Sequence, residues 1–219
     1  MNFNIAIDGP AGAGKSTVAK IVADKLNMTY IDTGAMYRAI TLLSIQHGKN
    51  DVGDIINLAQ EVEIKIHEKY IYVNGEDVTE DVRNLEVTNK VSAIAQIPEI
   101  RVLMTKLQRE MARNKGVVMD GRDIGTAILP DAKYKFYLTA NVKERAARRH
   151  KELIKNGQKV TLEQIEKDII QRDRQDKLRA FSPLAVAEDA AIIDTTEKNI
   201  MQVVQEILCY IKRGEGFVL

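Results

Sequence analysis

The chain has 219 residues, of which 45% are hydrophobic, and its 32 basic and 31 acidic side chains leave a formal net charge of +1. This composition predicts one folded domain over residues 1–219 with an ample hydrophobic core, and it argues against a disordered chain. The near-neutral charge argues against bulk electrostatic binding to nucleic acid or to a membrane surface, so we expect neither as a partner.

Membrane segments and disulfides are not expected either. No apolar run in the sequence approaches the ~20 residues that span a bilayer. The first strand pattern begins too close to Met1 to leave room for a signal peptide. The single cysteine, Cys209, lies in the apolar stretch Ile207–Ile211 and is predicted to be a small buried hydrophobe. We therefore expect a soluble, cytoplasmic, monomeric protein.

Two strand–helix pairs open the chain. The short apolar runs Phe3–Ile7 and Thr29–Asp32 predict buried strands, and the spacing of apolar residues predicts a helix over Lys15–Leu26. A second helix is expected over about Ala35–His47, with Thr33 as its N-cap. This alternation predicts a parallel sheet with right-handed crossovers.

Residues 62–83 interrupt this pattern. Apolar residues alternate with charged ones from 62 to 67, a second apolar run covers 70–73, and Asn74-Gly75 is a strong signal for a tight hairpin turn. A short third strand is expected at 76–78. The sequence therefore predicts a small antiparallel β insert at 62–83.

The parallel pattern returns after the insert. The remaining predicted strands lie at 116–120, 135–138 and 192–194, and the remaining predicted helices lie at 85–95, 98–113, 142–155, 162–179 and 199–213. The fold class is therefore predicted to be α/β, with about five parallel strands, helices on both faces of the sheet, and the β insert.

The segment between the first strand and the first helix matches a phosphate-binding loop in full. Gly9-x-x-x-x-Gly14-Lys15-Ser16 is the Walker A pattern, in which glycines let backbone N–H groups point at an anion. Lys15 is expected to reach the β- and γ-phosphates of a nucleoside triphosphate, and the Ser16 hydroxyl to bind Mg²⁺. The residues predicted to bind ATP are Gly9, Pro10, Ala11, Gly12, Ala13, Gly14, Lys15, Ser16 and Thr17.

A carboxylate ends the strand predicted at 116–120. An apolar strand that ends in Asp resembles the second half of a nucleoside triphosphate site, so Asp120 is a candidate for holding Mg²⁺, directly or through water. The alternative is that Asp120 caps the following turn or pairs with Arg122. The sequence favours neither interpretation over the other.

The choice of acceptor depends on what stands opposite the phosphate loop. A hydroxyl acceptor needs a carboxylate base, for which Asp8 or Asp32 is available. A phosphate acceptor is already a nucleophile and instead needs cations that overcome the repulsion between two anions. Arg38 and Arg122 each follow a predicted strand, at the edge where open α/β sheets bind ligands. A guanidinium group meets phosphate oxygens two at a time, so these residues favour a phosphate acceptor.

Two late helices carry further arginines. On the helix predicted at 162–179, Arg172, Asp176 and Arg179 fall near one face, at spacings of four and three. The preceding helix holds Arg145, Arg148 and Arg149. Each cluster alone is typical of a solvated helix with ion pairs. Beside a phosphate loop, a mobile lid that carries arginines is the other interpretation.

With these residues the sequence resembles the bacterial cytidylate kinases, a family of nucleoside monophosphate kinases with the P-loop fold. The resemblance runs nearly end to end. The segments that carry it are IDGPAGAGKST, DTGAMYR, GEDVTEDVR, DGRDIGT and RDRQDKLR, at 7–17, 32–38, 75–83, 120–126 and 172–179.

The resemblance implies roles for individual residues. The residues it places around CMP are Thr33, Arg38, Ser92, Arg101, Arg122, Asp123, Arg172 and Asp176. Those it makes catalytic are Lys15, Arg122, Arg172 and Arg179, while Ser16 and Asp120 are the candidate Mg²⁺ ligands. Among these, Ser92, Arg101 and Asp123 correspond to residues that read the cytosine edge. Ser92 and Arg101 rest on the resemblance alone, because each otherwise passes for an ordinary helical residue.

The resemblance also implies regions and an activity. Residues 33–100, with the insert, form the monophosphate-binding region, and 145–182 form a helical lid. The predicted activity is transfer of the ATP γ-phosphoryl group to CMP and dCMP with Mg²⁺. Two alternatives remain open: another small P-loop kinase, acting on UMP or a hydroxyl metabolite, and a non-catalytic regulator that binds nucleotide.

Overall fold

The predicted parallel strands form one five-stranded sheet in the computed structural model, which describes residues 2–67, 70–155 and 157–215. In chain order the strands are β1 (Ile5–Asp8), β2 (Thr29–Asp32), β6 (Val117–Gly121), β7 (Tyr134–Thr139) and β8 (Ala191–Asp194). Their order across the sheet is β2-β6-β1-β7-β8, and every neighbouring pair is parallel. The central strand, β1, is therefore the one that leads into the phosphate loop.

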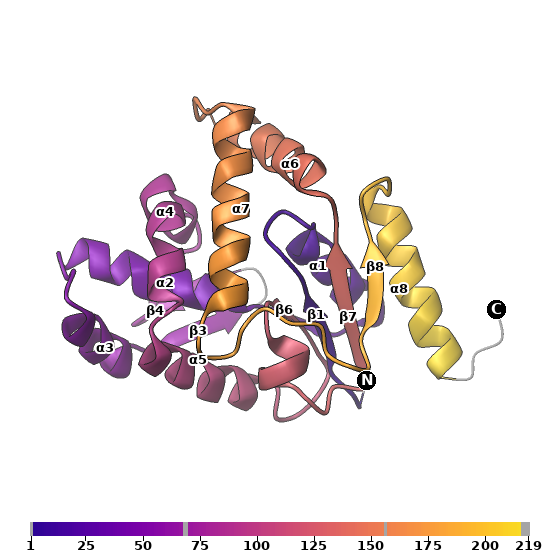
Figure 1. Ribbon diagram of the computed structural model, residues 1–219. Helices are drawn as coiled ribbons and strands as arrows, with labels where there is room; N and C mark the ends of the chain where they lie inside the picture. The colour runs from indigo at the N-terminus through magenta and orange to yellow at the C-terminus, as the bar shows by residue number, and fades with distance from the viewer. Residues whose placement is uncertain (1, 68–69, 156, 216–219) are drawn as a thin grey trace.

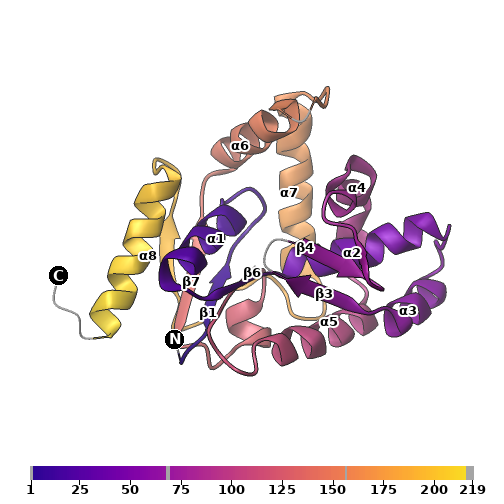
Figure 2. The ribbon, with the colours of Figure 1, turned by 180° about the vertical axis from the view of Figure 1, so that it is seen from behind.

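Helices cover both faces of this sheet, as predicted (Figures 1 and 2). Successive side chains of a strand point to opposite faces. Ile5 and Ile7 pack with α1 (Lys15–Leu26) and α8 (Ile200–Gly214). Ala6 packs on the other face with residues 124–128, which form one π-helical turn and contact α5 (Pro98–Met111). The two apolar layers hold the sheet between them.

The helix after β2 begins earlier than predicted. α2 spans Thr33–Gln46, and its N-cap is Asp32, whose carboxylate accepts a hydrogen bond from the backbone N–H of Ala35 at 3.0 Å. The prediction of Thr33 as the N-cap is therefore wrong. The hydroxyl of Thr33 donates instead to the backbone carbonyl of Asp120 at 2.7 Å, which ties the start of α2 to β6.

The β insert forms a separate three-stranded antiparallel sheet. It consists of β3 (Ile64–His67), β4 (Tyr70–Val73) and β5 (Glu76–Asp77), in that order, and residues 68 and 69 of the predicted insert lie outside the described part. Asn74 and Gly75 both have positive φ, 51° and 87°, as the predicted tight turn requires. A short 3₁₀ turn at Asp81–Arg83 leads to α4 (Leu85–Ile94).

One helix was not predicted. α3 (Val52–Glu61) precedes the insert, and Asp51 caps it by accepting from the backbone N–H groups of Gly53 and Asp54 at 2.8 and 3.4 Å. Its buried residues, Ile55 and Ala59, lie four apart and pack into a second apolar cluster with α2 and the insert.

Two long helices stand above the strand C-termini and converge at the top of the view in Figure 1. They are α6 (Val142–Lys155) and α7 (Leu162–Leu178), and residue 156 of the predicted lid lies outside the described residues. The pair has its own small core of Ala146, Leu153, Ile165 and Ile169. α7 runs from this core down toward the sheet, so one helix connects the pair to the strand edge.

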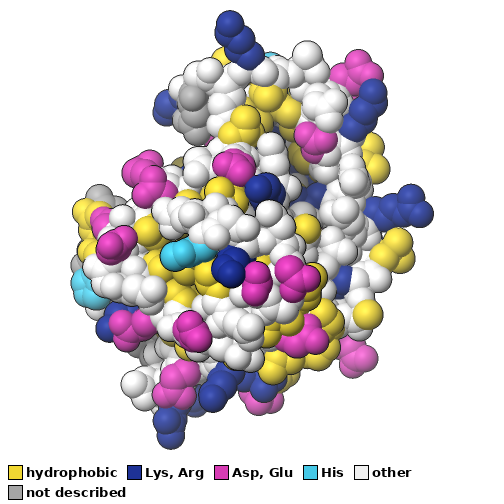
Figure 3. Space-filling model, turned by 90° about the vertical axis from the view of Figure 1, so that its left-hand side faces the viewer, with side chains coloured by type: hydrophobic (Ala, Val, Ile, Leu, Met, Phe, Trp, Pro, Cys, Tyr) yellow, Lys and Arg dark blue, Asp and Glu magenta, His cyan; other side chains and the backbone are white. Residues whose placement is uncertain are grey.

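Two further expectations concern α8 and the membrane. Cys209 is half-buried rather than buried, with its sulfur 3.9 Å from the Gln205 amide nitrogen, because it lies on the flank of α8 beside the buried residue Leu208. Within the described ranges, no helix combines the length and apolarity that crossing a membrane requires. Figure 3 shows basic and acidic side chains interspersed over the face at the left of Figure 1.

The end of β1 yields a stability prediction. Gly9 has φ of +146°, and a Cβ there would overlap the backbone carbonyl oxygen of Leu138. Gly9→Ala should therefore lower the free energy of unfolding by on the order of 3 kcal/mol or more, measured by urea denaturation. The matched control is Gly48→Ala, because Gly48 also has positive φ, +63°, but has no atom within 4 Å of a Cβ. That variant should lose only about 1 kcal/mol, and equal losses in the two variants would contradict the overlap.

Candidate active site

The phosphate loop joins β1 to α1 at the carboxyl edge of the sheet. Gly9, Gly12 and Gly14 have φ of +146°, +76° and +85°, a conformation that lets successive backbone N–H groups converge. Lys15 begins α1, is 5% exposed, and donates from Nζ to the carbonyl of Pro10 at 2.8 Å. The predicted loop therefore has the backbone of an anion site, with a buried cation at its base.

Burial and neighbouring charges perturb this lysine. Burial, followed by the positive charges of Arg122 and Arg172, lowers the pKa of Lys15 to about 7, against the opposing effect of Asp120 and Asp8. Three cations therefore influence one another at a single place, although they come from α1, the segment after β6, and α7. Such a cluster attracts anions. Phosphate groups suit it, because guanidinium groups bind phosphate oxygens in pairs.

Asp120 lies beside Ser16, as a shared Mg²⁺ site would require. Its carboxylate accepts hydrogen bonds from the Ser16 hydroxyl and the Tyr30 hydroxyl, both at 2.8 Å. Burial, followed by the charge of Asp32, raises the pKa of Asp120 to about 6. Sequence reasoning missed Tyr30, whose only signal is its place on β2, next to β6.

The donor set at this point suits a hard cation. A hydroxyl and a carboxylate are the oxygen ligands that Mg²⁺ takes from a protein when water and phosphates complete its shell. Among the described residues no group of three or more His, Cys, Asp or Glu side chains could hold a metal ion by itself. The residues present therefore fit a magnesium ion that arrives with a nucleotide.

The two carboxylates considered as bases for a hydroxyl acceptor are both engaged. Asp8 accepts from the backbone N–H groups of Ile124 and Gly125 at 2.8 and 2.7 Å, and burial raises its pKa to about 6. Asp32 caps α2 and has Arg83 at 3.7 Å. Both groups hold the backbone or a cation, so neither Asp8 nor Asp32 is a free base for a hydroxyl acceptor.

The predicted acceptor arginines approach this edge from three elements. Arg122 follows β6 and pairs through Nε with Asp176 of α7 at 2.9 Å. Burial and then the charge of Arg122 lower the pKa of Arg172 to about 10. The Arg172 Nε atom is buried and has no hydrogen-bond partner in the described part of the chain. Arg38 of α2 donates to the hydroxyl of Thr88 at 2.8 Å.

A second charged cluster, Arg101–Asp123–Arg179, lies behind the first. Asp123 has Arg101 Nη2 at 2.6 Å on one carboxylate oxygen and Arg179 Nη2 at 3.4 Å on the other. Arg101 is only 2% exposed, and its guanidinium lies 5.4 Å from the ring centre of Tyr37. Arg179 also lies 3.6 Å from Asp176, so the two charged clusters are continuous.

Ser92 and Thr33 join the same site from α4 and α2. The Ser92 hydroxyl donates to Gln175 of α7 at 2.9 Å. The Thr33 hydroxyl is bonded to the end of β6, next to Gly121 and Arg122. Residues predicted from separate parts of the sequence therefore meet around α7. Gln175 was missed because a polar residue in a charged helix carries no signal of its own.

The phosphate loop also contacts α6 and α7. Arg145 of α6 pairs with Asp173 of α7 at 2.7 Å and donates to the carbonyl of Ala11 at 2.8 Å. Asp173 accepts from the backbone N–H of Ala11 at 3.4 Å. The pair thus contacts both backbone polar groups of one loop residue. The sequence signalled Arg145 only as part of an arginine cluster and did not signal Asp173.

The fold and the loop together define the class of protein. A parallel α/β sheet with a Walker A loop on its central strand is that of a small P-loop kinase. A crystal structure of shikimate kinase from Bacteroides thetaiotaomicron has the same fold, with a TM-score of 0.51, 17% identity, and coverage of 96% of this chain and 98% of that one.

Sequence comparison then gives the family. The cytidylate kinase family profile matches residues 5–213. The cytidylate kinase of Clostridioides difficile (strain 630) is 49% identical over 94% of this chain and 97% of its own length, and that of Desulforamulus reducens is 52% identical over 96% and 97%. The chain belongs to the cytidylate kinase family, which confirms the resemblance seen in the sequence.

The perturbed lysine yields a pH prediction. Because burial lowers the pKa of Lys15 from 10.5 to about 7, the unfolded chain binds more protons than the folded chain between these pH values. The free energy of unfolding should therefore rise with pH across this window. Lys15→Met removes this contribution. Wild type should gain on the order of 3 kcal/mol relative to the variant between about pH 7 and pH 10, measured by urea denaturation.

The exposed Lys20, on the same helix, supplies the control. Lys20→Met should keep the wild-type pH profile, because that lysine is not buried. Parallel profiles for wild type and Lys15→Met would show that Lys15 has an ordinary pKa.

Proposed function

We propose that this chain transfers the γ-phosphoryl group of ATP to CMP and dCMP, giving ADP and CDP or dCDP. The observation that carries the proposal, beside family membership, is the cation cluster at the end of the phosphate loop, formed by the buried Lys15 and the half-buried Arg122 and Arg172. A site for one triphosphate needs no second set of arginines, whereas transfer between two phosphates does.

On the donor side, the loop residues Gly9–Thr17 hold the ATP phosphates by their backbone N–H groups. Lys15 contacts the β- and γ-phosphates. The juxtaposition of Ser16 with Asp120 supports these two as the protein's contribution to a Mg²⁺ site. A bound Mg²⁺ would neutralise charge that develops on the β- and γ-phosphate oxygens.

On the acceptor side, one charged cluster is proposed to bind the phosphate of CMP and the other to recognise its base. The arginines proposed to hold the CMP phosphate are Arg38, Arg122 and Arg172. The residues proposed to read cytosine are Ser92, Arg101 and Asp123. Cytosine offers an amino donor and two acceptors, its ring N3 and its carbonyl, which a carboxylate and a guanidinium match. Thr33 and Asp176 are proposed to lie near the sugar and phosphate.

Transfer itself requires positioning and charge neutralisation. The acceptor oxygen attacks the γ-phosphorus in line, and the arginines keep the two anions together without a base, because the acceptor is already ionised. Arg179 is proposed to stabilise the transferring group. Residues 33–100 act as the monophosphate-binding region and 145–182 as a lid that excludes water. The contact of Asp173 and Arg145 with Ala11 supports closure of that lid on the loop. We place the enzyme in the cytoplasm, as a monomer.

The acceptor assignment is tested by ADP release from ATP and Mg²⁺, measured with CMP, dCMP, UMP and no acceptor. We expect ADP release with CMP and dCMP alone, because Arg101 and Asp123 match the donor and acceptors of the cytosine edge. Release with UMP or a hydroxyl metabolite would indicate a different small kinase. Release without any acceptor would indicate a hydrolase, and ATP binding without release would indicate a regulator.

Arg122 provides a test at the level of one residue. Arg122→Ala should reduce kcat for CMP phosphorylation by about 10²–10³-fold, because it removes a charge that acts on the transferring group. ATP affinity should change little, because the loop is intact. The kcat of Arg122→Lys should fall between those of wild type and Arg122→Ala, because lysine keeps the positive charge but lacks the planar guanidinium group.

Arg113 is the matched control, because its side chain is 75% exposed and pairs only with Glu110 among the described residues. Arg113→Ala should behave as wild type. Unchanged turnover in Arg122→Ala would overturn the assignment of Arg122 to the acceptor phosphate.

A further inference from the structure

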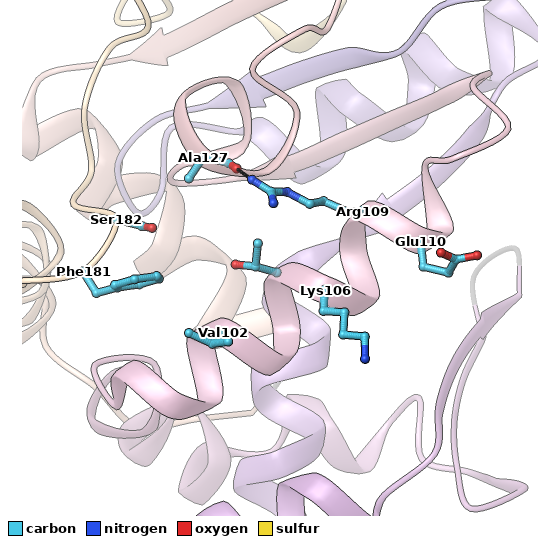
Figure 4. Close-up of a pocket in the computed structure, with 8 residues that line it drawn as sticks. Val102, Lys106, Arg109, Glu110, Ala127, Phe181 and Ser182 are labelled. Atoms are coloured by element: carbon cyan, nitrogen blue, oxygen red, sulfur yellow. Dashed lines mark hydrogen bonds between the residues drawn. The ribbon is translucent and has the colours of Figure 1, made fainter.

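A cavity of about 520 Å³ lies between α5, the turn at 124–128 and the segment that follows α7 (Figure 4). The side chains that matter for its chemistry are Val102, Thr105, Lys106, Arg109, Ala127 and Phe181. None of them belongs to the proposed ATP or CMP sites. The volume is within the range of small-molecule sites, about 300–1,000 Å³.

Each wall of this cavity is bonded to one member of the cluster Arg101–Asp123–Arg179. Val102 on α5 follows Arg101 directly. The backbone N–H of Ala127 donates to the carbonyl of Asp123 at 2.8 Å. Ser182, which lines the third wall, accepts at its carbonyl from Arg179 Nε at 2.5 Å. A molecule seated here therefore pushes on the backbone that positions all three charged residues.

The lining combines an aromatic surface with free cations. Phe181 is 40% exposed and Val102 is 54% exposed, so both present apolar area to the hollow. Lys106 has no carboxylate within 4.0 Å among the residues that the structure describes. The hydroxyl of Thr105 is buried and finds no hydrogen-bond partner in the described chain.

The cation at the back of the cavity is fixed in place. Arg109 donates to the carbonyls of Ile128 and Ala127 at 3.2 and 2.7 Å, and Figure 4 shows its guanidinium reaching across to Ala127. These bonds use Nε and Nη2, which leaves Nη1 to contact a ligand. Glu110, the one acidic lining residue, is largely exposed and pairs with Arg113 at 3.3 Å.

We propose that this cavity binds a small planar aromatic anion that alters the affinity for CMP. The ring of the ligand stacks on Phe181 and covers Val102. Its anionic group is held by Nη1 of Arg109, and Lys106, whose side chain is directed away from Arg109 (Figure 4), adds positive charge at the rim. Through Ser182 and Arg179, an occupied cavity changes the position of a residue that faces Asp123 and Asp176.

The probe for this site is 8-anilinonaphthalene-1-sulfonate, an aromatic anion whose fluorescence rises in an apolar site. The chain has no tryptophan, so the probe signal is free of energy transfer from that residue. We expect one molecule to bind per chain. Phe181→Ala and Lys106→Glu should each weaken binding about tenfold, the first by removing the ring and the second by reversing the charge.

Two control variants match these changes away from the cavity. Leu162→Ala removes a side chain that is 45% exposed at the start of α7, and Lys212→Glu reverses an exposed charge on α8. Both should bind the probe as wild type does. Wild-type affinity in Phe181→Ala and Lys106→Glu, or equal losses in all four variants, would overturn the proposal.

Coupling is read separately from binding. A saturating concentration of the probe should change KM for CMP by about threefold or more in wild type and have no such effect in Lys106→Glu, with KM for ATP unchanged in both. Displacement of the probe by CMP or ATP in proportion to their occupancy would instead place it in the substrate sites and refute the separate cavity. Displacement of the probe by benzoate would indicate that the natural ligand is an aromatic carboxylate. Displacement by AMP would indicate a nucleotide. Because probe binding is measured directly, a failure of the proposed kinase activity leaves the binding test intact, whereas the coupling test depends on that activity.

Discussion

The constraint on which the site depends is the repulsion between three cations held close together, with Lys15 buried and Arg122 and Arg172 half-buried. Arg122 and Arg172 lower the pKa of Lys15, and Arg122 also lowers the pKa of Arg172. Burial by itself would lower the pKa of Arg122, but Asp176, with Asp120 and Asp173, outweighs it and raises that pKa. The desolvation free energy of these charged groups is thus offset by partners on α7 and β6 and not by solvent. A phosphate-binding site is this arrangement with part of its anionic charge left for the ligand to supply.

Helix α7 concentrates these partners on one rigid element. Asp173 contacts the phosphate loop, Gln175 holds Ser92 on α4, and Asp176 pairs with Arg122 after β6. Three parts of the site are therefore joined through three residues within a single helical turn. Any movement of α7 changes all three contacts together, which couples the donor loop to the acceptor region without a dedicated hinge between them.

Local patterns were enough to predict the sheet, the phosphate loop and the hairpin turn at Asn74-Gly75, because each depends on residues close in sequence. They failed where the deciding partner is distant. Arg101 looks like an exposed helical arginine until Asp123, 22 positions away, is placed against it. The cap of α2 was assigned to Thr33 because its competing acceptor, the carbonyl of Asp120, is 87 positions away. The helix α3 was missed although Asp51 and the spacing of Ile55 and Ala59 signal it locally.

The strand order has a consequence for how acceptor choice can change. The donor loop follows β1 and Arg122 follows β6, and these strands are hydrogen-bonded neighbours, about 4.8 Å apart. Under the proposed assignment of Arg122 to the acceptor phosphate, the separation between the donor and acceptor phosphates is set by a spacing that every parallel sheet shares. Of the residues proposed to read the base, Ser92 lies on α4 and Arg101 on α5, both outside the sheet, whereas Asp123 lies just after β6. A new acceptor base can in principle be accommodated by altering those two helices, while the axis of phosphoryl transfer stays where the sheet holds it.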